Sequence, residues 1–309
     1  MDAESRIFIA GHRGMVGSAI KRTLLNYGYN NLIMRTRQEL ELTDYRQVEL
    51  FFAQEKPEYV FLAAARVGGI LANYMYPAEF IYENLSIQAN IIHNAYLNGV
   101  KKLLFLGSSC IYPRDALQPI KEDYLLTGKL EETNEAYAIA KIAGIKMCQS
   151  YNKQYGANYI AVMPTNLYGP GDNFDLETAH VLPALIRKYH QAKINKSPYI
   201  QIWGSGTPRR EFLYVDDLAE ACLYLMKEYH SSKIINIGVG KDLTINELAA
   251  LVSEVVDYKG EIMRDLAKPD GPSQKLLDLT RINQLGWQAK TDILSGIELT
   301  YNWYVNHEA

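Results

Sequence analysis

The chain is poor in cysteine, and its few cysteines are not arranged for covalent cross-links. Cys110, Cys148 and Cys222 are an odd number in 309 residues and show no Cys-x-x-Cys spacing. Disulfide scaffolds need paired thiols, and structural zinc sites need closely spaced ones. The sequence therefore predicts no metal site and no disulfide framework, and it favours a reducing, cytoplasmic setting.

Long apolar runs and a strong charge of one sign are also missing. The run at residues 59–65 has the length of a strand, whereas a membrane helix needs ~18 apolar residues. The polar start at residues 1–5 does not resemble a secretion signal. A formal net charge of -3 gives no global basic field that would hold nucleic acid. We therefore expect no membrane span, no secretion signal and no nucleic-acid partner.

Short apolar runs alternate with longer segments of helical periodicity. The runs lie at residues 7–10, 32–34, 59–63, 102–106 and 159–163. Residues 78–98 and 135–155 have the helical pattern. Continuous apolar strands are typical of a parallel sheet that helices cover on both faces. We predict an α/β fold, with a Rossmann-type doubly wound parallel sheet and a smaller α/β substrate-binding lobe.

A glycine-rich turn follows the first predicted strand directly and precedes a helical run. Its spacing is G-x-x-G-x-x-G, over Gly11, His12, Arg13, Gly14, Met15, Val16 and Gly17. Glycines here permit a tight turn and close approach of the backbone to a pyrophosphate, which the helix N-terminus attracts. We predict a dinucleotide site, with a simple glycine-rich turn as the alternative.

The second predicted strand ends in basic residues, where NAD-binding proteins normally carry a carboxylate for the ribose hydroxyls. The sequence there is Met34-Arg35-Thr36-Arg37. A guanidinium group pairs bidentately with a 2′-phosphate, and Arg13 in the glycine loop offers a second contact. The sequence therefore favours NADP(H) over NAD, unless these arginines are only solvated surface residues.

Tyr137 and Lys141 are four residues apart in a helical segment, so they share one face. A neighbouring ammonium group stabilises phenolate, and we expect it to lower the pKa of Tyr137 toward the working range. Ser108 follows the fourth apolar run and offers a hydroxyl to a substrate carbonyl. These residues predict a carbonyl reductase; a nucleotide-binding regulator without catalysis is the alternative of another class.

Taken together, these segments resemble the extended, nucleotide-sugar-modifying branch of the short-chain dehydrogenase/reductase superfamily, and within it the GDP-4-keto-6-deoxy-mannose epimerase/reductase family. The matching segments are residues 11–17, 62–69, 107–113, 164–169 and 203–208. The resemblance implies epimerisation of a GDP-sugar at C3 and C5, followed by NADPH-dependent reduction at C4. Another nucleotide-sugar epimerase, dehydratase or reductase of the branch is the alternative.

The resemblance also implies a role for each site residue. The catalytic residues would be Ser108, Cys110, Tyr137, Lys141 and His180, with Cys110 and His180 as the acid–base pair in an order that stays open. The cofactor would contact Gly11, His12, Arg13, Gly14, Met15, Val16, Gly17, Arg35, Arg37, Leu40, Leu42, Ala64, Leu106, Gly107, Tyr137, Lys141, Pro164, Asn166, Leu167 and His180. The substrate would contact Ser108, Ser109, Asn166, Lys188, Trp203, Arg210 and Asp278.

Two positions depart from the family pattern, because Arg66 stands where lysine is usual and Lys188 where arginine can occur. Both keep the charge but change its geometry.

Domain boundaries and assembly complete the expectations. We expect residues 1–165, rejoined by about 212–240, to form the NADP-binding Rossmann domain, and residues 166–211 and 241–309 to form the substrate-binding lobe. Thr244 and Glu247 have the spacing of a capping box at a helix start. The resemblance further implies a homodimer that packs through residues 78–98 and 135–155.

Overall fold

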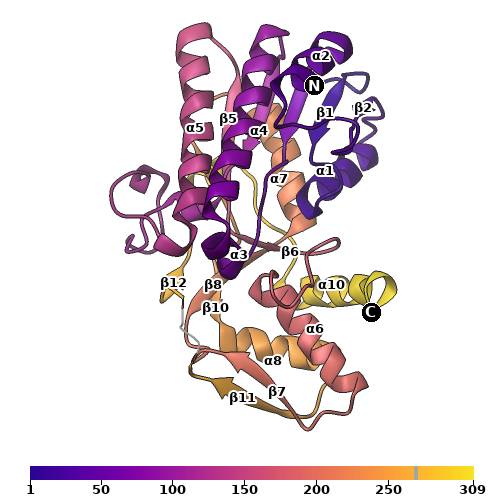
Figure 1. The fold of residues 1–309 in the computed structure, drawn as a ribbon, viewed down its shortest axis with the longest axis vertical. Coiled ribbons are helices and arrows are strands. Elements are labelled where there is room, and N and C mark those ends of the chain that lie inside the picture. Colours follow the sequence, from indigo (N-terminus) through magenta and orange to yellow (C-terminus); the bar gives the residue numbers. More distant parts are fainter. Residues whose placement is uncertain (268–270) are drawn as a thin grey trace.

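A parallel sheet organises the upper part of the protein (Figure 1). The computed structural model describes residues 1–267 and 271–309. The six strands run in the order β2-β1-β3-β4-β5-β9 and all pair in parallel. Their bounds are β1 Ile7–Ala10, β2 Leu32–Ile33, β3 Tyr59–Leu62, β4 Lys102–Leu106, β5 Tyr159–Pro164 and β9 Ile235–Ile237. β1, β4 and β5 are buried along their whole length, as strands covered on both faces must be.

Helices cover this sheet in two layers. One layer consists of α2 (Tyr45–Glu55), α4 (Pro77–Leu97) and α5 (Glu135–Tyr155), which pack side by side. The other contains α1 (Met15–Asn26) and α7 (Val215–Glu228). A sheet with helices on both faces and this strand order is doubly wound, so the predicted fold class is confirmed. Each helix of the described residues is too short or too polar to cross a bilayer.

A smaller α/β lobe lies below the sheet (Figure 1). Its strands surround β8, which pairs with β6, β10 and β12, while β7 pairs with β11. The strand bounds are β6 Asn166–Tyr168, β7 Tyr199–Trp203, β8 Arg209–Tyr214, β10 Asp242–Thr244, β11 Glu261–Asp265 and β12 Gln274–Lys275. The helices are α6 Val181–Ile194, α8 Ile245–Val256 and α10 Ile293–His307, whereas α9 (Thr280–Gln284) packs against β9 of the large sheet and α3 (Ile70–Met75) precedes α4. The predicted capping box of Thr244 and Glu247 starts α8.

Two hydrophobic cores correspond to these two parts. The larger contains the sheet strands and the inner faces of their helices, together with Leu277, Leu279 and Trp287 from near the C-terminus. The smaller contains residues of α6, α8 and α10 around Tyr189 and Phe212. The chain therefore passes more than once between the two parts, and each passage must be fixed by specific contacts.

Glu211 on β8 makes the most important of these contacts. Its side chain is buried, and one carboxylate oxygen accepts backbone hydrogen bonds from Val239 (2.6 Å) and Gly240 (2.7 Å), which follow β9. The other oxygen accepts one from Leu277 (3.1 Å), which follows β12. Position 238 must be glycine, because a β-carbon there would lie 2.2 Å from Glu211 Oε1. Burial raises the pKa of Glu211, and the three N–H donors oppose that shift.

The main chain of Glu211 adds a second connection. Its carbonyl oxygen accepts hydrogen bonds from Asn166 Nδ2 (2.8 Å) and Thr165 Oγ1 (3.2 Å), at the passage from β5 to β6. One residue thus joins the large sheet to the lower lobe at three chain segments.

We expect Glu211→Gln to lower the free energy of unfolding by about 3 kcal/mol, because its amide N–H₂ would face N–H donors in a buried site. Glu261→Gln on the exposed side of β11 is the matched control and should change it by less than about 0.5 kcal/mol. Denaturant unfolding at neutral pH measures both. Equal, small effects of the two substitutions would show that the Glu211 contacts contribute little.

Candidate active site

The glycine loop has the geometry of a dinucleotide cradle at the carboxyl end of β1. Gly11 has φ of +86°, and a β-carbon there would lie 2.7 Å from the backbone nitrogen of Ala64. A β-carbon on Gly17 would lie 2.1 Å from the Gly11 carbonyl oxygen. α1 begins at Met15, inside this loop, and its N-cap Gly14 has no side chain that could cap the first N–H groups. The first N–H groups of α1 are therefore available to a pyrophosphate.

His12, inside this loop, supplies a polar atom that also fits a bound cofactor. Its Nδ1 is buried and has no hydrogen-bond partner within the described residues. Burial lowers the pKa of His12, and the charges of Lys21 and Arg13 lower it further, so the ring is neutral at neutral pH. The closely packed glycines and this unsatisfied ring nitrogen together fit an NADP(H) diphosphate.

The arginines after β2 are held by carboxylates of the chain. Arg35 Nη2 lies 2.5 Å from Glu55 Oε1, and Arg35 Nη1 donates to the Met34 carbonyl at 2.8 Å. Arg37 is more exposed and pairs with Glu41 at 2.7 Å. Both positions lie beyond the carboxyl end of β2, as a 2′-phosphate site requires. Leu40 is buried, and Asn90 donates to the Leu42 carbonyl, so the loop carrying these arginines is fixed.

Ser108 lies at the carboxyl end of β4, where the chain turns into the 3-10 helix Ser109–Ile111. Its hydroxyl oxygen accepts a hydrogen bond from the Cys110 backbone N–H at 3.3 Å. Gly107 donates to the Val162 carbonyl at 2.9 Å, and a β-carbon there would lie 2.5 Å from the sulfur of Met163. The turn that presents Ser108 and Cys110 is thus held closely against β5.

Tyr137 and Lys141 lie on the inner face of α5. Lys141 Nζ donates to the Leu106 carbonyl at 2.7 Å and lies 5.6 Å from the centre of the Tyr137 ring. Burial lowers the pKa of Lys141 to about 8. The pKa of Tyr137 is raised by burial, and negative charge at Cys110 raises it further. The expectation that the pKa of Tyr137 is lowered is therefore wrong for this arrangement, because burial is the largest influence on that pKa.

Cys110 completes the cluster around Tyr137 and Lys141. The residue is 8% exposed, and burial raises the pKa of its thiol. The charge of Lys275, the Ser108 hydrogen bond and the charge of Lys141 all lower that pKa. Like Cys148 and Cys222, Cys110 forms no disulfide.

His180 is the N-cap residue of α6 and approaches from the lower lobe. The segment before it is tied to the loop at residues 66–69, because Gly69 N–H donates to the Thr178 carbonyl at 3.0 Å. Desolvation by the surrounding protein lowers the pKa of His180, although the residue remains exposed to solvent. Within the described residues, no hydrogen bond joins His180 to Cys110 or Tyr137.

Arg66 explains one departure from the family pattern. Its guanidinium contacts two carboxylates on successive turns of α4, with Nη2 2.5 Å from Glu79 Oε2 and Nη1 2.6 Å from Glu83 Oε1. It also lies over the ring of Phe80, 5.4 Å from its centre, and Phe80 packs edge-on against Tyr137. The planar fork of arginine makes each carboxylate contact with a separate nitrogen while its flat face lies over the Phe80 ring.

Several of the predicted substrate residues have partners within the lower lobe. Lys188 Nζ lies 5.4 Å from the centre of the Trp203 ring and donates to the Gln201 carbonyl. Arg210 Nη1 donates to the Pro272 carbonyl at 2.7 Å. Asn166 binds the Glu211 carbonyl, so its amide has a structural contact already.

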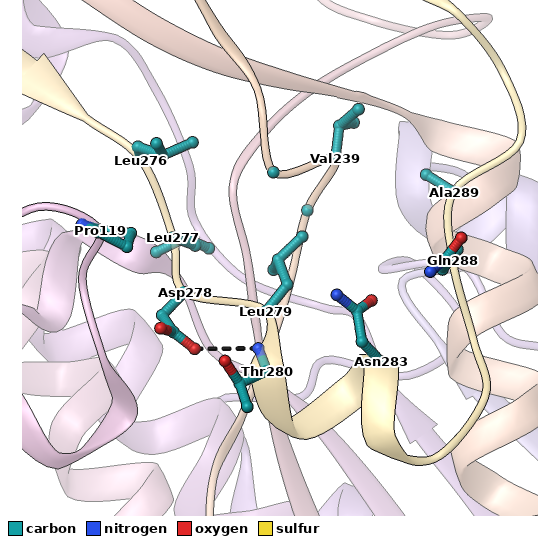
Figure 2. Close-up of a pocket in the computed structure, with 12 residues that line it drawn as sticks. Pro119, Val239, Leu276, Leu277, Asp278, Leu279, Thr280, Asn283, Gln288 and Ala289 are labelled. Carbon is teal, nitrogen blue, oxygen red and sulfur yellow. Dashed lines mark hydrogen bonds between the residues drawn. The ribbon is translucent and has the colours of Figure 1, made fainter.

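Asp278 lies apart from the other predicted site residues. It accepts a hydrogen bond from the Thr280 backbone N–H at 2.9 Å, at one side of a cavity of about 420 Å³ (Figure 2). Residues 238–240 after β9 and residues 276–280 line this cavity, together with Asn283 and Gln288. No other predicted site residue lines it.

Sequence reasoning missed two residues of the site. The charge of Lys275, like that of Lys141, lowers the pKa of the Cys110 thiol, and Glu211 lies on the strand that carries Arg210. Neither has a local motif. Glu211 lies on β8 and Lys275 on β12. These strands are far apart in the sequence, and only their pairing brings the two residues to the site.

We expect Arg35→Gln to weaken NADPH binding by about 10-fold to 100-fold and to leave NADH binding unchanged, because it removes a charged partner of the 2′-phosphate. Arg46→Gln is the matched control, since the side chain of Arg46 is 83% exposed on α2 and forms an ion pair with Glu49. Fluorescence titration of both reduced cofactors measures the effect. An equal loss for NADH and NADPH would contradict the assignment.

The chain is similar to known proteins along its whole length. Residues 7–238 match the NAD dependent epimerase/dehydratase family. A putative GDP-L-fucose synthase 2 of Arabidopsis thaliana is 57% identical, over 99% of this chain and 94% of its own length. GDP-L-fucose synthase of Escherichia coli (strain K12) is 54% identical, over 99% of this chain and 98% of its own length.

Among solved structures, GDP-mannoheptose C4 reductase from Campylobacter jejuni with NADP bound superposes with a TM-score of 0.92 and 43% identity, covering 99% of each chain. NADP(H) is accordingly the cofactor of this group of enzymes, as the basic residues after β2 predict. The fold, the glycine loop, the Tyr137–Lys141 pair and these similarities lead to one conclusion: the chain belongs to the NAD dependent epimerase/dehydratase family.

Proposed function

We propose that the protein converts GDP-4-dehydro-6-deoxy-D-mannose to GDP-L-fucose, by epimerisation at C3 and C5 and NADPH-dependent reduction at C4. The observation that carries the proposal is the cluster of Ser108, Cys110, Tyr137 and Lys141 beyond the carboxyl end of β4. Such a cluster combines a carbonyl-binding hydroxyl, a proton donor and a second acid–base group. The similarity to GDP-L-fucose synthases supports this substrate.

Epimerisation uses the acidity of protons next to a carbonyl group. Hydrogen bonds from Ser108 and Tyr137 to O4 stabilise the enolate that forms when a proton leaves C3 or C5. Cys110 and His180 act on opposite faces, one taking the proton and the other returning it. Burial raises the pKa of Cys110 and so favours the thiol, and desolvation lowers the pKa of His180 and so favours the neutral ring.

Reduction needs a proton at O4. When bound, NADPH supplies the hydride for C4. Tyr137 donates its phenolic proton to O4, and its raised pKa keeps that proton in place until it is needed. Lys141, 5.6 Å from the ring centre, stabilises the phenolate that remains. The phenolate then recovers a proton from solvent.

For the rest of the substrate, we propose that Lys188 and Arg210 bind the diphosphate and that Trp203 offers a surface to the base. The side chain of Trp203 is half exposed beside Lys188, which supports this assignment. Asp278 lines the cavity of Figure 2, so it would contact the substrate only if part of the substrate lies in that cavity.

We further propose a homodimer that packs through α4 and α5. Exposed apolar side chains on their outer faces support it, at Tyr82 and Leu97 on α4 and at Ile139 and Tyr155 on α5. The unpaired thiols of the three cysteines support a cytoplasmic location.

We also propose that residues 1–165 with about 212–240 form the cofactor-binding domain, and that residues 166–211 and 241–309 form the substrate-binding lobe.

A C4 reductase without epimerase activity is the second candidate, because a relative of 43% identity has that name. Such an enzyme needs Ser108, Tyr137 and Lys141 but not the acid–base pair. Cys110 beside Tyr137 favours the bifunctional reaction.

We expect the protein to consume NADPH when it is mixed with GDP-4-dehydro-6-deoxy-D-mannose, and to incorporate deuterium from solvent at C3 and C5. Cys110→Ser should slow that incorporation by about 100-fold, as loss of an acid–base group does. Tyr137→Phe should slow NADPH oxidation by a similar factor. Absorbance at the reduced-nicotinamide band and NMR of the sugar measure the two steps. NADPH oxidation without incorporation would favour the simple reductase.

The pH dependence of reduction follows from Lys141. Its pKa of about 8 means that the ammonium is present below that pH and is lost above it. We therefore expect the rate of NADPH oxidation on already epimerised substrate to fall by about tenfold per unit above pH 8. In Lys141→Arg, whose guanidinium keeps its charge, this fall should disappear. A wild-type rate that stays constant well above that pH would contradict the role of the ammonium.

A further inference from the structure

A polar residue stands in the middle of β9, a strand that is otherwise apolar. Asn236 lies between Ile235 and Ile237, and all three residues are fully buried. A buried amide group is costly unless its donors and its acceptor are hydrogen-bonded. In the order of the sheet, β5 separates β9 from β4. The partners of Asn236 therefore show what β9 holds in place besides its neighbouring strand.

The side-chain amide of Asn236 has a hydrogen-bond partner at each of its polar atoms. Its Oδ1 accepts a hydrogen bond from the Tyr112 hydroxyl at 2.6 Å. Its Nδ2 donates to the Ile120 carbonyl at 3.0 Å and to the Asp278 carbonyl at 3.1 Å. The backbone N–H of Asn236 donates to Glu122 Oε1 at 3.1 Å. With these contacts Asn236 is a fixed anchor for the Tyr112 side chain.

Tyr112 ends the short turn that carries Ser108 and Cys110. The hydrogen bonds within this turn are long. The Cys110 nitrogen lies 3.3 Å from Ser108 Oγ, and the Tyr112 nitrogen lies 3.5 Å from the Ser109 carbonyl oxygen. Good N–H···O bonds are about 2.9–3.0 Å long, so these internal bonds are weak. The position of the turn therefore depends on the short bond from Tyr112 to Asn236.

The surroundings of Tyr112 keep its hydroxyl a hydrogen-bond donor. The residue is 3% exposed, and burial raises its pKa well above the ordinary value. The charge of Glu122 raises that pKa further. A phenol that keeps its proton donates to Asn236 Oδ1 throughout the neutral pH range.

A second contact fixes the opposite end of the same turn. Gly107 N–H donates to the Val162 carbonyl on β5 at 2.9 Å. The chain is thus held by β5 before Ser108 and by β9 after Cys110, through Tyr112. Both side chains that would act on the sugar lie between these two anchors.

We propose that Tyr112 and Asn236 are positioning residues, whose hydrogen bond holds Ser108 and Cys110 in place for the reaction. The inference rests on the proposed function for the roles of Ser108 and Cys110. Ser108 must lie within hydrogen-bond distance of O4, and Cys110 within reach of a proton on carbon. A misplacement of about 1 Å can slow such steps by about 100-fold. Tyr112 affects the chemistry only through this placement.

Tyr112→Phe tests the proposal, because it removes the hydroxyl and keeps the ring. Hydrogen exchange of the backbone amides at residues 108–112, measured by mass spectrometry without substrate, reports the opening of the turn. We expect this exchange to be about tenfold faster than in the wild type. Tyr258→Phe is the matched control, since Tyr258 is 7% exposed and donates to the Ser197 carbonyl at 2.9 Å in the lower lobe. It should leave exchange at residues 108–112 unchanged.

Activity measurements show whether the placement matters for the reaction. We expect Tyr112→Phe to lower kcat about tenfold, both for deuterium incorporation at C3 and C5 and for NADPH oxidation, with an unchanged KM for NADPH. Tyr258→Phe should keep both rates, even where its free energy of unfolding falls as much. Asn236→Ser, whose side chain is too short to reach the Tyr112 hydroxyl, should lower kcat similarly. Adding Tyr112→Phe to it should lower kcat no further, because both changes remove one bond.

Three results would overturn the proposal. The first is wild-type exchange at residues 108–112 in Tyr112→Phe. The second is an unchanged kcat in that variant, with or without a rise in KM for the GDP-sugar, because a positioning residue must affect turnover. The third is a double variant whose losses add, because Tyr112 and Asn236 would then act separately. Failure of the wild-type protein to use the GDP-sugar would contradict only the proposed function, because the exchange measurement needs no substrate.

Discussion

The buried carboxylate of Glu211 is the contact on which the geometry of the site depends. Its oxygens hold the ends of β9 and β12, and its carbonyl holds the passage from β5 to β6. This one residue therefore fixes the position of the lower lobe relative to the large sheet. The same contacts fix β8 and β12, the paired strands that carry Arg210 and Lys275.

Burial decides the protonation states in the cleft. It raises the pKa values of Tyr137 and Cys110 and lowers those of Lys141 and His180, so each group shifts toward its uncharged form. An uncharged thiol suits the buried position of Cys110. A charge on Cys110 then has to be stabilised only while a proton is transferred. The positive charges of Lys141 and Lys275 favour that charged form.

The sequence predicted the features that depend on local patterns. Strand-length apolar runs, the glycine spacing and the four-residue interval of Tyr137 and Lys141 are readable from neighbouring residues, and the fold class and the capping box of α8 are confirmed. The direction of the Tyr137 shift was wrong, because the extent of burial cannot be read from a motif. Glu211 and Lys275 were missed for a related reason: their importance arises from strand pairing across more than sixty residues.

The contacts of Arg66 with α4 determine what a substitution at position 66 would change. One guanidinium holds Glu79 and Glu83 while its flat face covers Phe80, the ring that supports Tyr137. A lysine offers a single point of charge and no flat face, so it cannot replace all three contacts. Replacing Arg66 alone would therefore disturb Glu79, Glu83 and Phe80 together, and through Phe80 the ring of Tyr137.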